Sequence, residues 1–321
     1  MTSPAPGITG PLTPYVVPGD ALTGWPVGVD FSTIPMGTNI VAGQKTAALY
    51  NMCQSSTQQV DEYCNQPLRA TLTTETQSGP DYYLTVQVGS GLGRMELQRW
   101  PVTQIISVQV AASAGFPRQW TTLPAGYWDI EKPPQGVYGS NVPSGAGEGG
   151  QAILIAPGYV NWWNGRNGLR VQVQYMHGWP HAGLTTAGSA STSSLVVDDC
   201  TGWGPPGTNS AANSTYGATG VIYDGASQET IQCTAASATA GPGTLTLSSP
   251  LTYTHAAGVM VSALPANVIW SSALFTGADA LTRGATTTTV RNISGHAGGP
   301  SGADELRIDA EMKLRPYRAT V

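Results

Sequence analysis

The sequence is short of charged residues. Only 10% of its 321 residues are Asp, Glu, Lys or Arg, against about 25% in an ordinary soluble protein. Its 14 Lys and Arg residues form no basic cluster, and the formal net charge is -5. Proteins that grip nucleic acid need a basic stripe, so this balance argues against such a function. A subunit whose surface is covered by neighbouring copies fits the low charge; a sparsely charged secreted or β-rich monomer is the alternative.

Long apolar runs and targeting segments are also missing. Even the stretch Thr230–Ala278, which holds no Asp, Glu, Lys or Arg, is interrupted by Ser, Thr and Gly, whereas a membrane-spanning helix needs about 20 apolar residues in a row. No basic residue precedes Lys45, and the N-terminal region has no apolar core of signal-peptide length. The sequence therefore predicts no membrane contact and a protein that is made in, and stays in, the cytosol.

Cysteine is scarce, with four residues in the whole chain. Cys53 and Cys64 fall on one predicted helix, about 16 Å apart at the helical rise, which is too far for a disulfide. We interpret both as core thiols. Cys200 and Cys233 fall in a later β-rich segment, and the sequence leaves open whether they pair across a sheet.

Histidine is equally scarce, and its spacing suggests no metal site. His177 and His181 have a spacing that suits a helical metal site, but Gly178 and Pro180 lie between them and exclude a helix. His255 is expected to hold a turn by hydrogen bonding. We therefore expect no bound metal.

Motifs for catalysis are absent as well. The sequence contains no G-x-S-x-G nucleophile elbow, no H-E-x-x-H helix and no phosphate-binding P-loop. The carboxylates of Asp198, Asp199 and Asp224 are isolated near expected strand ends, where Asp commonly serves turns. No nucleophile, base and orienting group come together, so we expect a protein that is not an enzyme and that binds no cofactor.

What the chain has in abundance is glycine, proline and short apolar runs. Residues 1–43 combine many Pro and Gly with scattered apolar side chains, including Tyr15, Val17, Trp25 and Phe31. This composition excludes a helix or regular sheet. We interpret residues 1–43 as an extended N-terminal arm in which these four side chains contact a neighbouring subunit; a disordered tail is the alternative.

Helical and β patterns follow the arm. Apolar residues recur at helical spacing over 44–64 and again over 266–283 and 303–314. Between them lie short β-type runs at 69–76, 82–88, 95–97, 102–111, 127–130, 152–155 and 169–180. The predicted fold class is α+β: a small bundle of three helices packed with an antiparallel β region.

One segment differs in composition from its surroundings. The strand pattern that ends at Pro180 finds its natural continuation at Leu264–Pro265, and residues 182–262 between them contain four acids and no Lys or Arg. Short β runs at 195–197, 220–223, 229–233, 244–247 and 259–262 predict a small barrel or sandwich. We therefore expect an inserted all-β domain at 182–262 and a core formed by 44–181 and 263–321.

Joined together, the flanks resemble a known family. Six segments, in their order along the chain, resemble the head-to-tail connector (adaptor) proteins of long-tailed bacteriophages. These segments are Val60–Leu68, Thr74–Pro80, Gln98–Thr103, Val171–Pro180, Leu264–Val268 and Leu306–Arg318. The inserted segment resembles a small β module of phage structural proteins. The chain departs from plainer connectors by carrying that module and the long arm.

The resemblance implies a structural virion protein. It implies a homo-oligomeric, twelve-fold ring in the neck of the virion, assembled in the host cytoplasm, that extends the DNA channel below the portal protein. The ring would offer a docking surface to the tail or to tail-terminator or stopper proteins, and DNA would pass through its lumen without specific binding. By the same resemblance the C-terminal residues Arg315, Pro316, Tyr317 and Arg318 insert into the portal.

A different class of function stays open. In a tail-associated protein, the β module would bind host-surface carbohydrate through Trp203, Tyr216 and Tyr223. A secreted carbohydrate-active enzyme would need a pair of matched carboxylates, which the sequence does not show.

Overall fold

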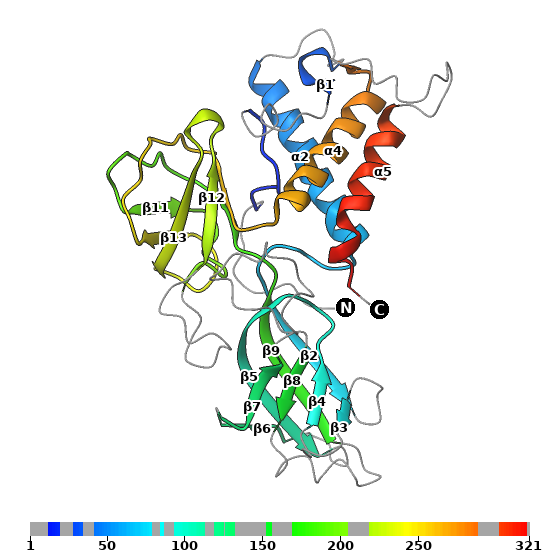
Figure 1. Ribbon diagram of the computed structural model, residues 1–321, viewed down its shortest axis with the longest axis vertical. Helices are drawn as coiled ribbons and strands as arrows, with labels where there is room; N and C mark the ends of the chain where they lie inside the picture. The colour runs from blue at the N-terminus through cyan, green and yellow to red at the C-terminus, as the bar shows by residue number, and fades with distance from the viewer. Residues whose placement is uncertain are drawn as a thin grey trace.

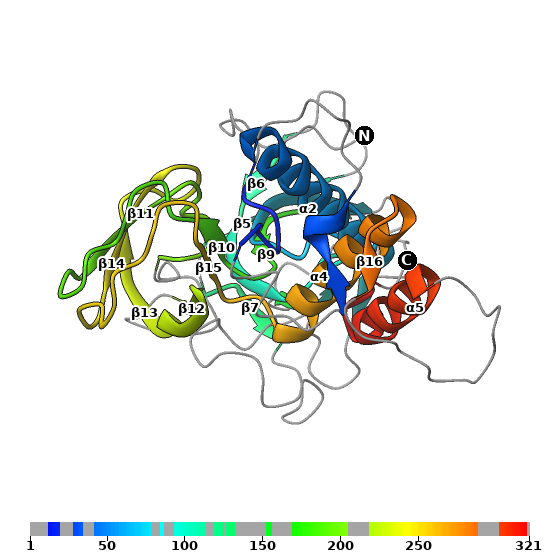
Figure 2. The same cartoon turned by 90° about the horizontal axis from the view of Figure 1, so that it is seen from above.

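The structure is a computed structural model that describes residues 12–19, 28–34, 42–78, 84–86, 93–112, 119–124, 126–131, 152–155, 169–204, 218–287 and 302–319. These residues form three lobes that meet near the middle of the molecule (Figure 1). Seen from above, one β lobe lies to the side of the helices (Figure 2). The predicted α+β class is confirmed in its coarse form: the described residues contain three α-helices and several antiparallel sheets.

The helical lobe consists of α2 (Ala42–Cys64), α4 (Ala266–Thr282) and α5 (Gly302–Leu314). Helix α4 lies between the other two, and its residues 271–278 are all buried. Because so much of α4 is covered, its hydroxyl groups need partners inside the lobe. Ser272 and Thr276 both hydrogen bond to Ser56 of α2 at 2.9 Å. A short pair of strands, β1 (Val29–Asp30) and β16 (Thr286–Thr287), and the turn η1 (Phe31–Thr33) complete this lobe.

The sandwich lobe contains two four-stranded sheets whose inner faces share one apolar core. Strand β9 shows the period-2 pattern expected from sequence, with Val171, Val173 and Tyr175 fully buried. One sheet has the order β2-β9-β5-β6, and its strands are β2 (Thr71–Ser78), β9 (Leu169–His177), β5 (Val102–Ala112) and β6 (Thr121–Thr122). The other has the order β3-β4-β8-β7, with β3 (Leu84–Val86), β4 (Gly93–Glu96), β8 (Ala152–Ile155) and β7 (Trp128–Glu131).

The barrel lobe is one six-stranded antiparallel sheet that closes on itself. The order is β10-β15-β12-β13-β14-β11, and a bridge between Leu184 and Val197 joins its two ends. The strands are β10 (His181–Gly183), β11 (Ser194–Val197), β12 (Thr219–Tyr223), β13 (Glu229–Ala236), β14 (Gly243–Leu247) and β15 (Met260–Ser262), with the turn η2 (Gly225–Ser227) after β12. Trp203 fills the interior with no exposed surface. A Cβ atom at Gly220 would stand 2.5 Å from the Trp203 ring, so only glycine fits there.

The chain enters and leaves the barrel lobe at adjacent points. His181 pairs with Ser262 across β10 and β15, and the next pair outward is joined by a hydrogen bond from Ala263 N to Pro180 O at 2.8 Å. The expected strands of 182–262 all appear, and the structure adds β10, whose three residues carry no β pattern. The boundary of an independently folding domain stays a prediction.

The cysteines are all free and buried. For Cys53 and Cys64 this confirms the interpretation as core thiols on helix α2. Cys200 and Cys233, whose pairing the sequence left open, are both unbonded in the core of the barrel lobe.

Candidate interaction surface

The C-terminal tail folds back onto its own chain. Helix α5 ends at Leu314 because Pro316 follows, and residues Arg315–Tyr317 form a 3-10 turn, η3. The side-chain amide of Gln66 donates to the Tyr317 carbonyl at 3.0 Å, and Ala319 N donates to the Cys64 carbonyl at 2.8 Å. The tail is therefore tied to the C-terminal end of helix α2.

The side chain of Tyr317 belongs to an aromatic cluster. Its ring stacks on Trp100 with centroids 6.3 Å apart, and it meets Trp179 edge to face at 5.7 Å. Trp100 follows the sandwich strand β4, and Trp179 follows β9, so the cluster joins the sandwich lobe to the helical lobe. Burial raises the pKa of the Tyr317 hydroxyl above its ordinary value. A hydrogen bond with Asn267 lowers this pKa, but its effect is smaller than that of burial. Tyr317, expected to anchor the tail in a portal, is thus already half-buried against its own chain.

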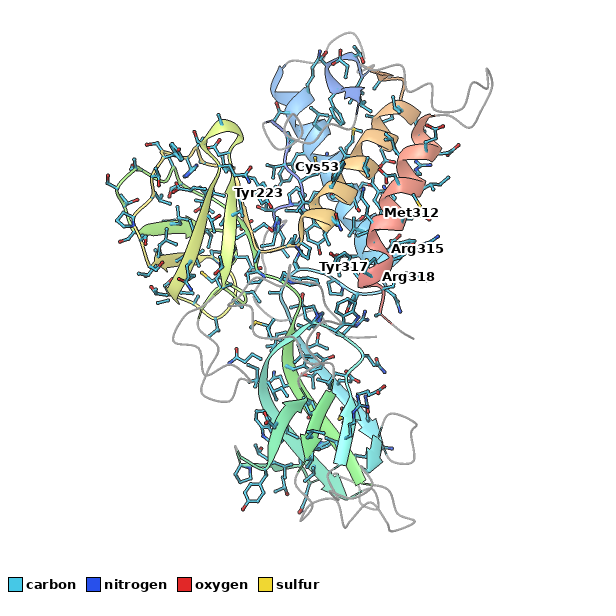
Figure 3. All side chains as sticks on the ribbon, viewed as in Figure 1. Cys53, Tyr223, Met312, Arg315, Tyr317 and Arg318 are labelled. Carbon is cyan, nitrogen blue, oxygen red and sulfur yellow. The ribbon has the colours of Figure 1, made fainter. Side chains whose placement is uncertain are left out.

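The other tail residues face outward. Arg315, Pro316 and Arg318 are exposed, and the Arg318 guanidinium lies 5.2 Å from the centre of the Tyr63 ring. On the preceding helix, Ile308 and Met312 leave 56% and 51% of their surface exposed. Figure 3 shows Met312 and Arg315 on the outer side of α5. We call this outer surface, formed by these five residues, the tail surface: two apolar side chains beside two guanidinium groups and a proline.

Residues 13–17 of the expected arm are buried in the same chain. The Tyr15 hydroxyl donates to Asp61 at 2.7 Å and accepts from the backbone N–H groups of Leu68 and Arg69 at 3.1 and 2.9 Å. Its backbone N donates to the Thr57 hydroxyl of helix α2 at 2.9 Å. Burial raises the pKa of Asp61 to about 6, although the hydrogen bonds that its carboxylate accepts from the Tyr15 hydroxyl and from Leu68 N, together with the charge of Arg69, oppose the rise.

The same segment also reaches the barrel lobe. The Thr13 backbone N and hydroxyl both donate to Asp198, at 3.1 and 2.6 Å. His181 lies 2.9 Å from the Pro14 carbonyl through Nε2 and 2.9 Å from the Ser262 hydroxyl through Nδ1. Burial, together with the charge of Arg69, lowers the pKa of His181 to about 3. Residues 12–17 therefore join the helical lobe, the barrel lobe and the start of the sandwich lobe.

This placement differs from the sequence-based expectation for the arm. Tyr15 and Val17 have 0% and 6% of their surface exposed inside their own chain, so they offer no side chain to a neighbour in this arrangement. Phe31 is half-buried against the helical core, and Trp25 lies outside the described residues. The apolar content of the arm did indicate burial, but composition does not distinguish burial in the same chain from burial in a neighbour.

Most of the other histidines and aromatics considered as binding residues are buried inside the fold. Burial also lowers the pKa of His177 to about 3, and within the described part of the chain no three His, Cys, Asp or Glu residues are grouped to hold a metal. Of the three aromatics through which the alternative function would bind carbohydrate, Trp203 is fully buried, Tyr223 packs partly buried against the helical core, and Tyr216 falls outside the described residues. Trp203 therefore offers no face to a ligand.

Comparisons with protein families, with curated protein sequences and with solved structures found no match to this chain. None of the helices that the structure describes is long and apolar enough to cross a membrane.

Proposed function

We propose that this protein is a structural component of the neck of a tailed-phage virion. In this proposal it forms a twelve-fold ring between portal and tail, extends the DNA channel, and offers a docking surface to the tail or to terminator or stopper proteins. It acts without catalysis and without a cofactor.

One observation carries the proposal: the close approach of Pro180 and Ala263. Because the two ends of the barrel lobe are hydrogen-bonded neighbours, removing that lobe would leave strand β9 running directly toward helix α4. The remaining order is helix, antiparallel β region and two C-terminal helices, which is the order that the resemblance implies. This supports the finer fold proposal of a connector core with an inserted β module.

The surface chemistry supports the same function. A net charge of -5 with few Lys and Arg residues suits a channel through which DNA must slide, because each Lys or Arg contact adds affinity for phosphate and would slow passage. The tail surface, with exposed Ile308 and Met312 beside Arg315 and Arg318, suits a protein contact. In this proposal the tail surface binds the portal, while Tyr317 positions the tail from inside.

Negative-stain imaging of the purified protein, alone and with its portal, tests the proposal. We expect closed rings in both samples, stacked coaxially on the portal in the second. If the protein forms rings that do not bind the portal, the assignment to the neck is wrong. If the protein is uniformly monomeric and does not bind the portal, the proposed function is wrong.

A further inference from the structure

A hollow on the outer face of the barrel lobe has the chemistry of a binding site. It has a volume of about 400 Å³ and lies beside strand β13 and the segment 248–252. None of its lining residues belongs to the tail surface. We call it the hydroxyl groove. The side chains that matter for its chemistry are Thr219, Glu229, Thr230, Gln232, Ser249 and Thr252. Its volume falls in the range of about 300–1,000 Å³ that is typical of small-molecule sites.

The lining is polar but almost uncharged. Hydroxyl groups and one amide make up most of it, and these groups both donate and accept hydrogen bonds. Glu229 is the one charged residue of the lining, and the sequence has no Lys or Arg anywhere in 182–262. A phosphate, sulfate or carboxylate ligand would therefore meet the Glu229 carboxylate with no Lys or Arg in the lining to pair with.

The wall of the groove is fixed by a buried cluster around Glu229. Its Oε1 lies 2.7 Å from Nε2 of His255, and its Oε2 accepts from Thr252 N at 2.8 Å. His255 is fully buried and also lies 2.9 Å from Asp224 through Nδ1, so His255 holds this turn as the sequence suggested. Burial raises the pKa of Glu229, but the hydrogen bonds from His255, Thr252 and Tyr253 outweigh it and leave the pKa below its ordinary value. A wall held in this way needs little ordering when a ligand binds.

An exposed tyrosine, Tyr253, is joined to the wall of the groove through its backbone, and its side chain is not part of the lining. Tyr253 follows Thr252 directly, its backbone N donates to Glu229 at 3.2 Å, and its side chain is 44% exposed. Strand β13 is paired with β12 on one side and with β14 on the other, so the groove offers no open sheet edge to a peptide strand.

We propose that the hydroxyl groove binds a neutral saccharide. The hydroxyl groups and the amide can donate to and accept from the hydroxyl groups of a sugar, and the two apolar lining residues, Ile231 and Pro250, can contact its C–H groups. The lack of Lys and Arg in the lining disfavours acidic glycans. This proposal is independent of ring formation, because it concerns one barrel lobe and would place a saccharide contact on the outside of each subunit.

Titration calorimetry of the full-length protein with a panel of neutral oligosaccharides, built from glucose, galactose, mannose or N-acetylglucosamine, tests the proposal. Polygalacturonate serves as the acidic comparison. We expect binding of at least one neutral oligosaccharide and no binding of polygalacturonate. The double variant Gln232→Ala, Ser249→Ala should weaken that binding by about tenfold or more, as expected for lost hydrogen bonds to a bound ligand.

The variant Ser194→Ala is the matched control, because Ser194 is exposed on the same barrel but does not line the groove. It should bind the saccharide as the unchanged protein does, and circular dichroism should show that all variants are folded. Absence of binding across the neutral panel, equal binding of polygalacturonate, or unchanged affinity in the double variant would each overturn the proposal. Ring formation is measured separately, so a ring without saccharide binding removes only the groove proposal, and a saccharide-binding monomer removes only the ring.

Discussion

The backbone N–H of Ala263 donates a hydrogen bond to the carbonyl oxygen of Pro180, with 2.8 Å between nitrogen and oxygen. These two residues stand on either side of the barrel lobe in sequence, yet they are neighbours in space. A segment whose ends are this close can be shortened with little strain on its surroundings. Two contacts between the barrel lobe and the rest of the chain would be lost if the lobe were removed. Met260 is buried in the helical core, and the Thr13 hydroxyl donates to Asp198.

We predict that a short Gly/Ser linker can replace residues 183–262. The helical and sandwich lobes should still fold, because Met260 is the one buried residue of 183–262 in their described cores, but the melting temperature should fall through loss of the Met260 and Thr13 contacts. Circular dichroism melting and electron microscopy measure the two effects. An aggregated or unfolded product would show that the barrel lobe is part of the folding core.

The tail surface predicts a charge-dependent contact with the portal. The double variant Arg315→Glu, Arg318→Glu should leave the fold unchanged, since both side chains are exposed, while its binding to DNA-filled heads that lack this protein should be lost. The variant Arg283→Glu is the control, because Arg283 is exposed just after helix α4, away from the tail. Head binding is measured by co-sedimentation. If the double variant still binds as tightly as the control, the portal contact lies elsewhere.

Tyr317 should stabilise the free protein. Tyr317→Ala removes the ring contacts with Trp100 and Trp179, and aromatic pairs contribute about 0.5–1.5 kcal/mol each beyond burial. The free energy of unfolding should therefore fall by about 1–3 kcal/mol in chemical denaturation. Tyr317→Phe keeps the ring and should lose less. Equal stability of the alanine variant and the unchanged protein would mean that the tail is not docked on its own chain.

The buried histidines predict loss of stability in acid. The pKa of His181 is about 3 in the folded chain, below its ordinary value of 6.5, so folding favours the neutral ring. The stabilisation is complete above pH 6.5 and is lost as the pH falls from 6.5 toward 3, by about 1.4 kcal/mol per pH unit. His177 acts in the same direction, and Asp61, with its pKa raised to about 6, acts in the opposite direction between about pH 4 and 6.

The variant His181→Gln isolates this contribution. Its unfolding free energy between pH 4.5 and 6 should depend on pH less steeply than that of the unchanged protein, by the equivalent of about one proton. Denaturant titrations at several pH values measure the difference. The same slope in both proteins would show that His181 is not held neutral in the fold.

Much of the fold was predictable from local patterns. The helix predicted over 44–64 is α2 at Ala42–Cys64, and the alternation of Val171, Val173 and Tyr175 correctly predicted β9. The strand β10 was missed because His181–Gly183 has no alternation; its place is fixed by pairing with β15. Patterns of this kind report local periodicity and not distant partners.

The candidate sites were harder to predict for the same reason. Tyr15 and Val17 were assigned to a neighbouring subunit and Tyr317 to a portal, whereas the structure packs all three against their own chain. The sequence alone does not show which partner covers an apolar side chain. Trp203, which the alternative carbohydrate-binding function would use, fills the barrel core. The hydroxyl groove was not foreseen, because Thr230 and Gln232 lie in a run that was interpreted only as a strand.

Native mass spectrometry of the purified full-length protein tests most directly whether the protein forms a closed ring. The proposal predicts one dominant assembly at twelve times the chain mass of 33.3 kDa, which persists on dilution and binds a portal ring one to one. A spectrum of monomers at every protein concentration, with none captured by the portal, would contradict it.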